Sequence, residues 1–474
     1  MRWDFYGPFY DPTNRISTFI PTLGGIVYTG HGIDTLYPRR YTNFAPRIGF
    51  AYSPRAKWVV RGDYGLYFDR PLLKAFADNR PPNGGATGVL ANPGTVAPVF
   101  SVTRANYTIV PNQPIFGNAA LPPPPYGLFS VSQDFGNAYT QDFGLNVQYQ
   151  LSSSTVLQVG YVGNLGRRLL TIRDINQPPP SLLGASAVRS SQDKLRPYYA
   201  AFPQFSTINE IQSIGNSEYN ALVASIRTNV WHGLTSQFSY IYGHAIDEGS
   251  AIRSRNPTDS RNLRFDRGNS DYDVRHTFRD YIVYSLPAFG HGPARLVQGW
   301  QVNSTMSFYS GFPFTAYSGR NVSGTFEGRD RVDLIGDPYK GGSQSIITTS
   351  SGSKYVQYLN PAAFAQPAPG TFGNLARNAL YGPGFADVDF AVVKNTPITE
   401  RVRTQFRVEM FNLFNRTNLP IPGSGGASMT SPPGTRLNSS SFGRIFDTVG
   451  DYIGAPGIGA GEPFNVQLAL KIVF

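Results

Sequence analysis

The sequence predicts an all-β protein, an antiparallel transmembrane β-barrel. Three observations support this fold class. Apolar residues alternate with polar residues in many segments, the connections between these segments alternate between short and long, and no apolar run approaches the roughly 18 residues of a membrane-spanning helix. Alternation of period 2 gives a strand one apolar face and one polar face. In a barrel the apolar face contacts lipid, and the polar face lines the lumen.

The clearest alternation is in the last strand, where the apolar residues include the C-terminal residue itself. Polar residues such as Gln467 and Lys471 lie opposite the apolar row, which is formed by Phe464, Val466, Leu468, Leu470, Ile472 and Phe474. Such a row fits the edge of a soluble sheet or a strand that closes a barrel. Alone, it favours the barrel over the soluble sheet.

Reading every alternating segment in this way predicts about twelve strands. They are residues 1–7, 44–53, 57–68, 140–151, 154–163, 218–229, 233–246, 276–286, 300–309, 386–395, 402–413 and 464–474. The short links between them are 54–56, 152–153, 230–232, 287–299 and 396–401, and the long ones are 8–43, 69–139, 164–217, 247–275, 310–385 and 414–463. Strict alternation of link length predicts tight periplasmic turns at one end and long extracellular loops at the other.

Composition excludes several other classes of protein. The 474 residues carry a net charge of +11, but Lys and Arg are scattered without a basic cluster, so we expect no nucleic-acid binding. The absence of cysteine excludes disulfides and thiolate metal sites. The five histidines are far apart, and neither a nucleophile elbow nor a phosphate-binding loop occurs. We therefore expect no metal, no cofactor and no enzymatic activity.

Several strings resemble one known family. They are 43–52 (NFAPRIGFAY), 60–69 (VRGDYGLYFD), 266–276 (DRGNSDYDVRH), 310–314 (SGFPF), 359–364 (LNPAAF), 382–384 (GPG) and 406–415 (FRVEMFNLFN). Together they resemble the C-terminal portion of a TonB-dependent outer-membrane receptor of the Oar-like kind, which carries a carboxypeptidase-regulatory-like N-terminal domain. The resemblance extends over nearly the whole chain, in the same order.

This resemblance implies a barrel of about 22 strands that holds a plug domain. Because the chain supplies about twelve strands, we expect residues 1–474 to be the C-terminal part of the barrel, without the plug and about ten N-terminal strands. No apolar segment follows Met1, so we also expect the secretion signal of an exported protein to be missing.

The resemblance further implies a function in the cell outer membrane. It implies energy-coupled uptake of a scarce ligand, such as a glycan, a peptide or a metal chelate. The implied partners are outer-membrane lipid and lipopolysaccharide, the TonB complex acting through the absent plug, and the barrel-assembly machinery, which reads Phe474 as a signal. A passive porin-like channel, a surface adhesin and a soluble all-β secreted domain remain alternatives.

Charged residues on the strands are candidates for a lumen lining. Arg near the middle of the lipid face costs about 2–4 kcal/mol, so we expect charged strand residues to face the lumen. There they pair with the plug or with neighbouring strands, or they line a substrate path. The candidates are Arg61, Asp63, Arg407 and Glu409.

Aromatic residues of the long loops are candidates for a ligand surface, although packing between loops is the simpler role for each of them. They are Tyr198, Tyr199, Phe202, Phe205, Tyr317, Phe326, Tyr355 and Tyr358. A separate acidic string, Asp266, Asp271 and Asp273, has oxygen ligands of the kind that calcium prefers. It lacks EF-hand spacing, and the interleaved Arg267 and Arg275 favour an ion-pair network.

Overall fold

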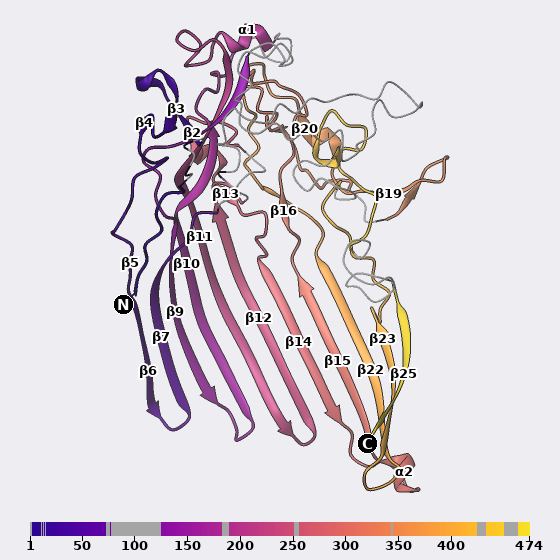
Figure 1. Cartoon of the computed structure of the whole chain (residues 1–474). Helices are drawn as coiled ribbons and strands as arrows, with labels where there is room; N and C mark the ends of the chain where they lie inside the picture. The colour runs from indigo at the N-terminus through magenta and orange to yellow at the C-terminus, as the bar shows by residue number, and fades with distance from the viewer. Residues whose placement is uncertain are drawn as a thin grey trace, which may run out of the picture.

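The computed structural model describes residues 2–10, 12, 14, 16–72, 76, 125–182, 189–250, 256–342, 345–423, 433–449 and 463–474. Within them, eleven long strands lie side by side in one antiparallel sheet (Figure 1). Their order in the chain is also their order across the sheet: β6 (Arg47–Arg55), β7 (Trp58–Phe68), β9 (Tyr139–Gln150), β10 (Thr155–Asp174), β11 (Phe205–Trp231), β12 (Leu234–Asp247), β14 (His276–Ser285), β15 (Trp300–Tyr309), β22 (Phe385–Pro397), β23 (Arg403–Phe411) and β25 (Asn465–Val473). Among the described residues β6 and β25 form two unpaired edges, so the sheet is open.

The predicted first strand, residues 1–7, is not a strand of this sheet. Only β1 (Arg2–Trp3) is extended and paired, and its partner is β5 (Phe44–Ala45) in a separate two-stranded sheet. Pro46 separates β5 from β6, and proline has no N–H to continue the ladder of hydrogen bonds. The alternation of apolar residues in 1–7 therefore overestimated the length of the strand.

Two strands are much longer than predicted. Residues 164–217 were expected to form a loop, but β10 continues to Asp174, β11 begins at Phe205, and their pairing extends to Asp174 opposite Asn209. A further strand, β8 (Tyr126–Val131), pairs in parallel with the extended part of β11. Because Ile172 and Ile211 are buried against the neighbouring loops, this extension lacks the lipid-type alternation that predicted the other strands.

Short turns gather at one end of the sheet and long connections at the other, which confirms the predicted alternation (Figure 1). A two-residue turn joins β11 to β12 through His232 and Gly233, whose φ angles are 47° and 85°. Positive φ at both positions is the requirement of a two-residue type I′ hairpin turn. The link between β14 and β15 instead contains the short helix α2 (Ala294–Val297). We refer to these two ends as the short-turn end and the cap end.

The register of the strands sorts their side chains onto two continuous faces. Residues directly opposite each other in neighbouring strands share a face, so Leu468 shares a face with Val408 and Val392. The same rule, applied across all eleven strands, defines an apolar face and a polar face. The apolar face is open to the surroundings, since Leu468 is 65% exposed and Ile48 is 72% exposed. Among the described residues, no helix is long and apolar enough to span a membrane.

An aromatic belt crosses the apolar face near the short-turn end. Its members lie within three residues of a strand end, and Trp58 and Tyr149 have ring centroids 4.5 Å apart. Aromatic rings with a polar edge concentrate where a bilayer meets water. The belt consists of Tyr52, Trp58, Tyr149, Trp231, Tyr284 and Trp300.

The long connections fold together into a cap over the other end of the sheet (Figure 1). They form small sheets, β2 (Ser17–Ile20) with β3 (Gly25–Thr29) and β4 (Gly32–Ile33), β16 (Pro313–Phe314) with β21 (Leu380–Tyr381), β17 (Asp333–Leu334) with β20 (Phe364–Ala365), and β18 (Ile347–Thr348) with β19 (Lys354–Gln357) and β24 (Arg444–Ile445). Strand β13 (Gly268–Asn269) pairs with β12, and the one described α-helix of the cap is α1 (Arg189–Asp193).

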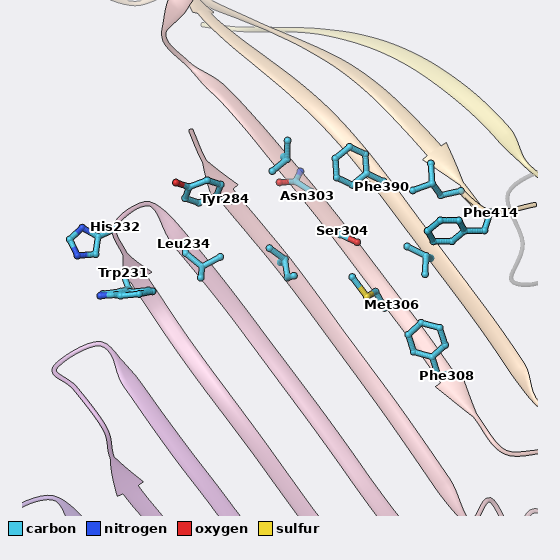
Figure 2. A pocket seen from close by; sticks show the side chains of 14 residues that line it. Trp231, His232, Leu234, Tyr284, Asn303, Ser304, Met306, Phe308, Phe390 and Phe414 are labelled. Carbon is cyan, nitrogen blue, oxygen red and sulfur yellow. The ribbon is translucent and has the colours of Figure 1, made fainter. Parts of the chain in front are cut away.

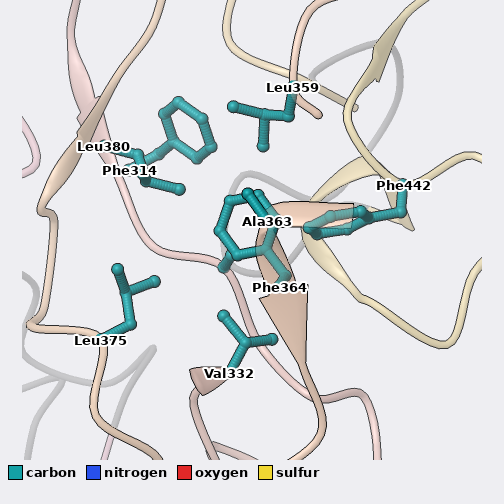
Figure 3. Packing of buried hydrophobic residues seen from close by; sticks show 9 residues of the cluster. Phe314, Val332, Leu359, Ala363, Phe364, Leu375, Leu380 and Phe442 are labelled. Atoms are coloured by element: carbon teal, nitrogen blue, oxygen red, sulfur yellow. The ribbon is translucent and has the colours of Figure 1, made fainter. Parts of the chain in front are cut away.

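The cap has hydrophobic cores of its own. The largest is built around Phe314, Leu359 and Phe364, and it also contains Ala316, Val332, Ala363, Leu375, Leu380 and Phe442 (Figure 3). Two smaller clusters form around Ile211 and around Ile208. Buried apolar side chains of this kind give the loops a fixed structure, since each contributes about 1.5–3 kcal/mol.

The strings that resemble the receptor family shape this cap. In 359–364, Asn360 accepts a hydrogen bond from Ala362 N at 3.1 Å and starts a 3₁₀ turn, which directs three neighbouring residues into the largest core. The glycines of 310–314 and 382–384 meet in space. A Cβ on Gly311 would lie only 1.8 Å from the carbonyl oxygen of Gly382, so this close approach requires glycine.

Candidate functional site

The four candidate charged residues lie on the polar face, whereas the register places two other charged strand residues, Asp280 and Lys394, on the apolar face, contrary to the expectation. Arg61 is opposite Asn146 in β9 and donates a hydrogen bond to Gln148 Oε1 at 3.1 Å. Arg407 Nη1 is 3.6 Å from Glu409 Oε1, within the same strand. Asp63 is opposite Gly144, again on the polar face. Arg61 thus makes a strand-to-strand contact, whereas Arg407 and Glu409 contact each other within β23. Contact of these residues with a plug or a substrate stays a prediction.

The loop aromatics take part in the packing of the cap. Phe205 and Tyr317 are buried, at 6% and 8% exposure, and the other six are half-buried. Tyr198, Phe202 and Phe205 all contact Phe19 edge-on, at centroid distances of 5.2–5.9 Å. The eight residues therefore do not gather into one exposed surface. Their part in ligand binding stays a prediction.

Tyr355 and Tyr358 belong to the opposite side of the cap. The guanidinium carbon of Arg444 lies 4.4 Å from the centre of the Tyr355 ring. Tyr358 donates a hydrogen bond to the Tyr381 carbonyl at 2.9 Å. Burial raises the pKa of the Tyr358 phenol above its ordinary value. Phe326 adopts a positive φ of 60°, which is rare for an aromatic residue and places it in a tight turn.

A buried arginine, Arg377, ties the cap to the end of the sheet. Its Nη1 donates to Asp247 Oδ1 at 2.6 Å and to the Asp247 and Asp266 carbonyls at 3.0 and 3.2 Å, while Nη2 donates to Ser250 Oγ at 2.7 Å. Nη2 also lies 3.4 Å from Asp271 Oδ1. These carboxylates raise the pKa of Arg377, although burial opposes them. One side chain thus holds loop 310–385 against β12 and residues 266–271.

Two further arginines repeat this arrangement. Arg196 is fully enclosed, and its guanidinium contacts Asp193 Oδ1 at 2.6 Å and Asp174 Oδ2 at 3.1 Å. Arg331 lies 3.4 Å from Asp266 Oδ1 and 3.9 Å from the centre of the Phe265 ring. Buried pairs of this kind cost desolvation free energy, and they fix one arrangement of the loops because breaking them is unfavourable.

The acidic string 266–273 is part of this network, which confirms the predicted ion-pair role. The partners differ from those expected. Asp273 does pair with Arg275, at 3.5 Å, but Arg267 pairs with Glu218 at 3.1 Å. Asp266 and Asp271 instead contact arginines more than 60 residues away. Within the described residues, no three His, Cys, Asp or Glu side chains form a group that could hold a metal ion.

Sequence reasoning missed the three arginine hubs. Local sequence gives a weak signal only for Arg196, which follows Asp193, the last residue of α1, by three residues. Arg377 is the one charged residue in the sequence between Lys354 and Asp387, and its main partner, Asp247, is 130 residues earlier. Such a contact is decided by the folding of the loops.

Glu327 lies in the same part of the cap and has an unusual protonation equilibrium. Its Oε2 accepts a hydrogen bond from Asn256 Nδ2 at 3.2 Å. Burial and the nearby Asp174 carboxylate raise the pKa of Glu327 to about 7 from an ordinary 4.5, while Arg329 and Arg196 oppose the rise. The cap therefore contains a carboxyl group that changes charge near neutral pH.

A hollow of about 880 Å³ lies on the apolar face of the sheet (Figure 2). It is lined mainly by apolar side chains from β12, β14, β15 and β22, among them Leu234, Tyr284, Met306, Phe308 and Phe390. A polar ligand finds few hydrogen-bond partners in such a hollow, whereas a hydrocarbon chain fits it.

An open antiparallel sheet with an apolar outer face, an aromatic belt, short turns at one end and a large cap at the other defines an outer-membrane β-barrel domain. The family model for the outer membrane beta barrel domain matches residues 1–452, and the chain belongs to that family. The fold class and the outer-membrane localisation expected from the sequence are confirmed. No curated protein sequence matches the chain.

The solved structures that the chain resembles are receptors and transporters of the outer membrane. The ferric-catecholate import receptor Fiu from K12 E. coli is 10% identical, with a TM-score of 0.40 over 90% of this chain and 34% of the receptor. The outer membrane transporter YddB from Escherichia coli is 9% identical, with a TM-score of 0.42 over 80% of this chain and 38% of YddB. The P. aeruginosa receptor FpvA is 11% identical, with a TM-score of 0.40 over 93% of this chain and 34% of FpvA. The chain thus spans little more than a third of the length of these proteins.

Proposed function

We propose that residues 1–474 form the C-terminal part of the barrel of a TonB-dependent receptor, which imports a scarce ligand across the outer membrane. The plug domain and the remaining strands lie elsewhere in the protein in this proposal. In the described part of the chain β6 and β25 are unpaired edges, and this supports the proposal because a barrel needs further strands to join them. The TonB complex acts on the plug, and the barrel-assembly machinery recognises Phe474, which is 90% exposed after β25.

The observation that carries this proposal is the cap, which Arg377 holds to the end of β12 and Arg331 holds together internally. A passive channel needs an open mouth, whereas a receptor for a scarce ligand needs a preformed binding surface. The buried arginine–carboxylate contacts fix loop 310–385 in one position relative to β12 before any ligand arrives. Lipid chains cover the apolar face in this proposal, including the hollow of 880 Å³. The protein has no catalytic role.

Uptake measurements test this function. Cells that produce the full-length protein are offered labelled neutral oligosaccharides, peptides and ferric chelates, with and without a protonophore that collapses the inner-membrane proton gradient. We expect saturable uptake of one class and its loss in the presence of the protonophore. Uptake that is linear in concentration and insensitive to the protonophore would identify a porin, and surface binding without uptake would identify an adhesin.

A further inference from the structure

We propose that a polar cavity at the cap end of the polar face binds an uncharged, polyhydroxylated ligand such as a neutral saccharide. This inference rests on the proposed receptor function and names the ligand class. The cavity has a volume of about 360 Å³ and lies between β10, β11 and β12 on one side and residues 270–274 on the other. Its volume falls within the roughly 300–1,000 Å³ of small-molecule sites. The lining residues that matter are Asn164, Glu218, Tyr219, Ser270, Tyr272 and Asp273.

Two buried oxygen atoms of this lining lack hydrogen bonds. Ser270 and Asp273 are each 1% exposed, yet Ser270 Oγ and Asp273 Oδ2 have no hydrogen-bond partner. The other carboxylate oxygen, Asp273 Oδ1, accepts from Ala245 N at 2.6 Å, which fixes the direction of the side chain. Buried polar atoms in native proteins are nearly always satisfied, by protein, water or ligand. A ligand hydroxyl could donate to Asp273 Oδ2 and accept from Ser270 Oγ.

The charged groups around the cavity are already paired within the protein. Glu218 lies 3.6 Å from Arg167 Nη2 and 3.1 Å from Arg267 Nη2, and Asp273 Oδ2 lies 3.5 Å from Arg275 Nη2. Each carboxylate already has a guanidinium neighbour, so neither a cationic nor an anionic ligand finds an unpaired opposite charge. Hydrogen-bonding atoms in a site whose charged groups already have partners favour a neutral ligand.

Two tyrosines supply flat surfaces. The Tyr219 ring lies over Gly243, where an added Cβ would be 3.0 Å from the Tyr219 hydroxyl, so the absence of a side chain at Gly243 makes room for the ring. Tyr272 is 60% exposed and also lines an adjoining cavity of about 190 Å³. The two cavities share Ser217 and Tyr272, which gives space for more than one sugar ring. Aromatic faces present apolar surface to the C–H face of a sugar, and their hydroxyls remain free to hydrogen-bond.

Binding of labelled hexasaccharides to the full-length protein, purified from outer membranes, tests this site. The neutral probes are maltohexaose, cellohexaose and mannohexaose, and the charged comparators are hexamers of galacturonate and of glucosamine. We expect one neutral probe to bind, and Ser270→Ala, Asp273→Asn and Tyr272→Ala each to weaken its binding at least tenfold. Tyr10→Ala, which truncates a tyrosine that is 81% exposed, is the matched control and should bind as the unmodified protein does.

Ser270→Ala is the decisive variant. Because Ser270 Oγ makes no hydrogen bond within the protein, its removal breaks no native contact and should leave heat-modifiable migration unchanged. Asp273→Asn changes the side chain that accepts a hydrogen bond from Ala245 N, so this variant could fail to assemble. In that case the affinity of Ser270→Ala alone decides whether the site exists. Wild-type affinity of all three variants, preference for a charged hexamer, or no binding of any neutral probe would overturn the proposal.

Failure of this site and failure of the receptor function give different results. If energy-dependent uptake of some ligand persists unchanged in Ser270→Ala and Tyr272→Ala, the receptor function stands and the saccharide site is wrong. If a neutral probe binds and these variants weaken its binding, the saccharide site stands. If uptake is at the same time unaffected by the protonophore, the energy-coupled function is wrong.

Discussion

A charge placed on one face or the other of β25 gives the sharpest test of the membrane orientation. The two substitutions are Leu468→Arg and Gln467→Arg, at neighbouring positions in the same strand. Leu468 lies on the apolar face opposite Val408, whereas Gln467 lies on the polar face opposite Glu409. The same residue type is introduced at nearly the same depth, so the two variants differ mainly in the face that carries the new guanidinium.

The two variants should differ in stability because residues 468 and 467 face lipid and water, respectively. Leu468 is the fourth of nine residues in β25, near the middle of the strand, and it is 65% exposed on the lipid side. Arginine at the bilayer midplane of a barrel costs about 2–4 kcal/mol. At 467 the guanidinium faces water and the Glu409 carboxylate, and an exposed pair contributes about 0–1 kcal/mol in the favourable direction. The two variants should therefore differ by about 2–5 kcal/mol, which shifts the folding equilibrium of Leu468→Arg by roughly 30- to 5,000-fold relative to Gln467→Arg.

Urea titration of the full-length protein in phospholipid vesicles, followed by tryptophan fluorescence, measures this difference. The amount of heat-modifiable protein in outer-membrane fractions measures its consequence in cells. Leu468→Arg should unfold at a lower urea concentration and assemble poorly, while Gln467→Arg should behave like the unmodified protein. Equal unfolding free energies for the two variants, or a larger loss for Gln467→Arg, would refute the assignment of the faces.

Three further predictions concern the cap. Arg377→Met should lower the free energy of local opening around loop 310–385 by about 3–5 kcal/mol, because it leaves the Asp247 carboxylate, 3% exposed, without its partner; hydrogen exchange measures this, and unchanged protection near β12 would contradict it. Glu327 has a pKa of about 7 in the folded cap against an ordinary 4.5, so folding favours the neutral form of this carboxyl group. The free energy of unfolding of the cap should therefore fall by up to about 3 kcal/mol as the pH rises from about 4.5 to 7 and above. Glu327→Gln should abolish that pH dependence of hydrogen exchange, and an unaltered pH profile would contradict the role of this carboxyl. Gly311→Ala should displace the backbone contact with Gly382 and raise protease sensitivity of the cap, and unaltered cleavage kinetics would contradict the close approach.

The strands of the sheet could be predicted from local sequence because each follows a period-2 pattern that needs no knowledge of the rest of the chain. Leu468 and Gln467 were assigned to opposite faces in this way, and the register places them there. Tight turns such as His232-Gly233 were also predictable as short links between alternating segments. The same rule overestimated the length of the strand at residues 1–7. These residues pair only with Phe44 and Ala45, and Pro46 interrupts the pairing directly after them.

The cap could not be predicted in this way because its contacts join residues that are far apart in the chain. The extension of β10 to Asp174 depends on packing of Ile172 against loop residues, which replaces lipid alternation with a buried core. The cavity beside Ser270 and Asp273 exists because loop 266–275 folds back over β11 and β12.

The sequence by itself determined the class of fold, the two faces of each strand and the end at which the long loops lie. These features follow from side-chain alternation and link length. Both are local properties, because each strand by itself places apolar side chains in lipid and polar side chains in water. Only the tertiary structure decided which loop aromatics are buried, which arginine pairs with which carboxylate, and where polar atoms without hydrogen bonds line a cavity. Those outcomes depend on contacts between segments that are far apart in the chain. Desolvation and packing favour one arrangement of these segments, and a local sequence pattern does not predict it.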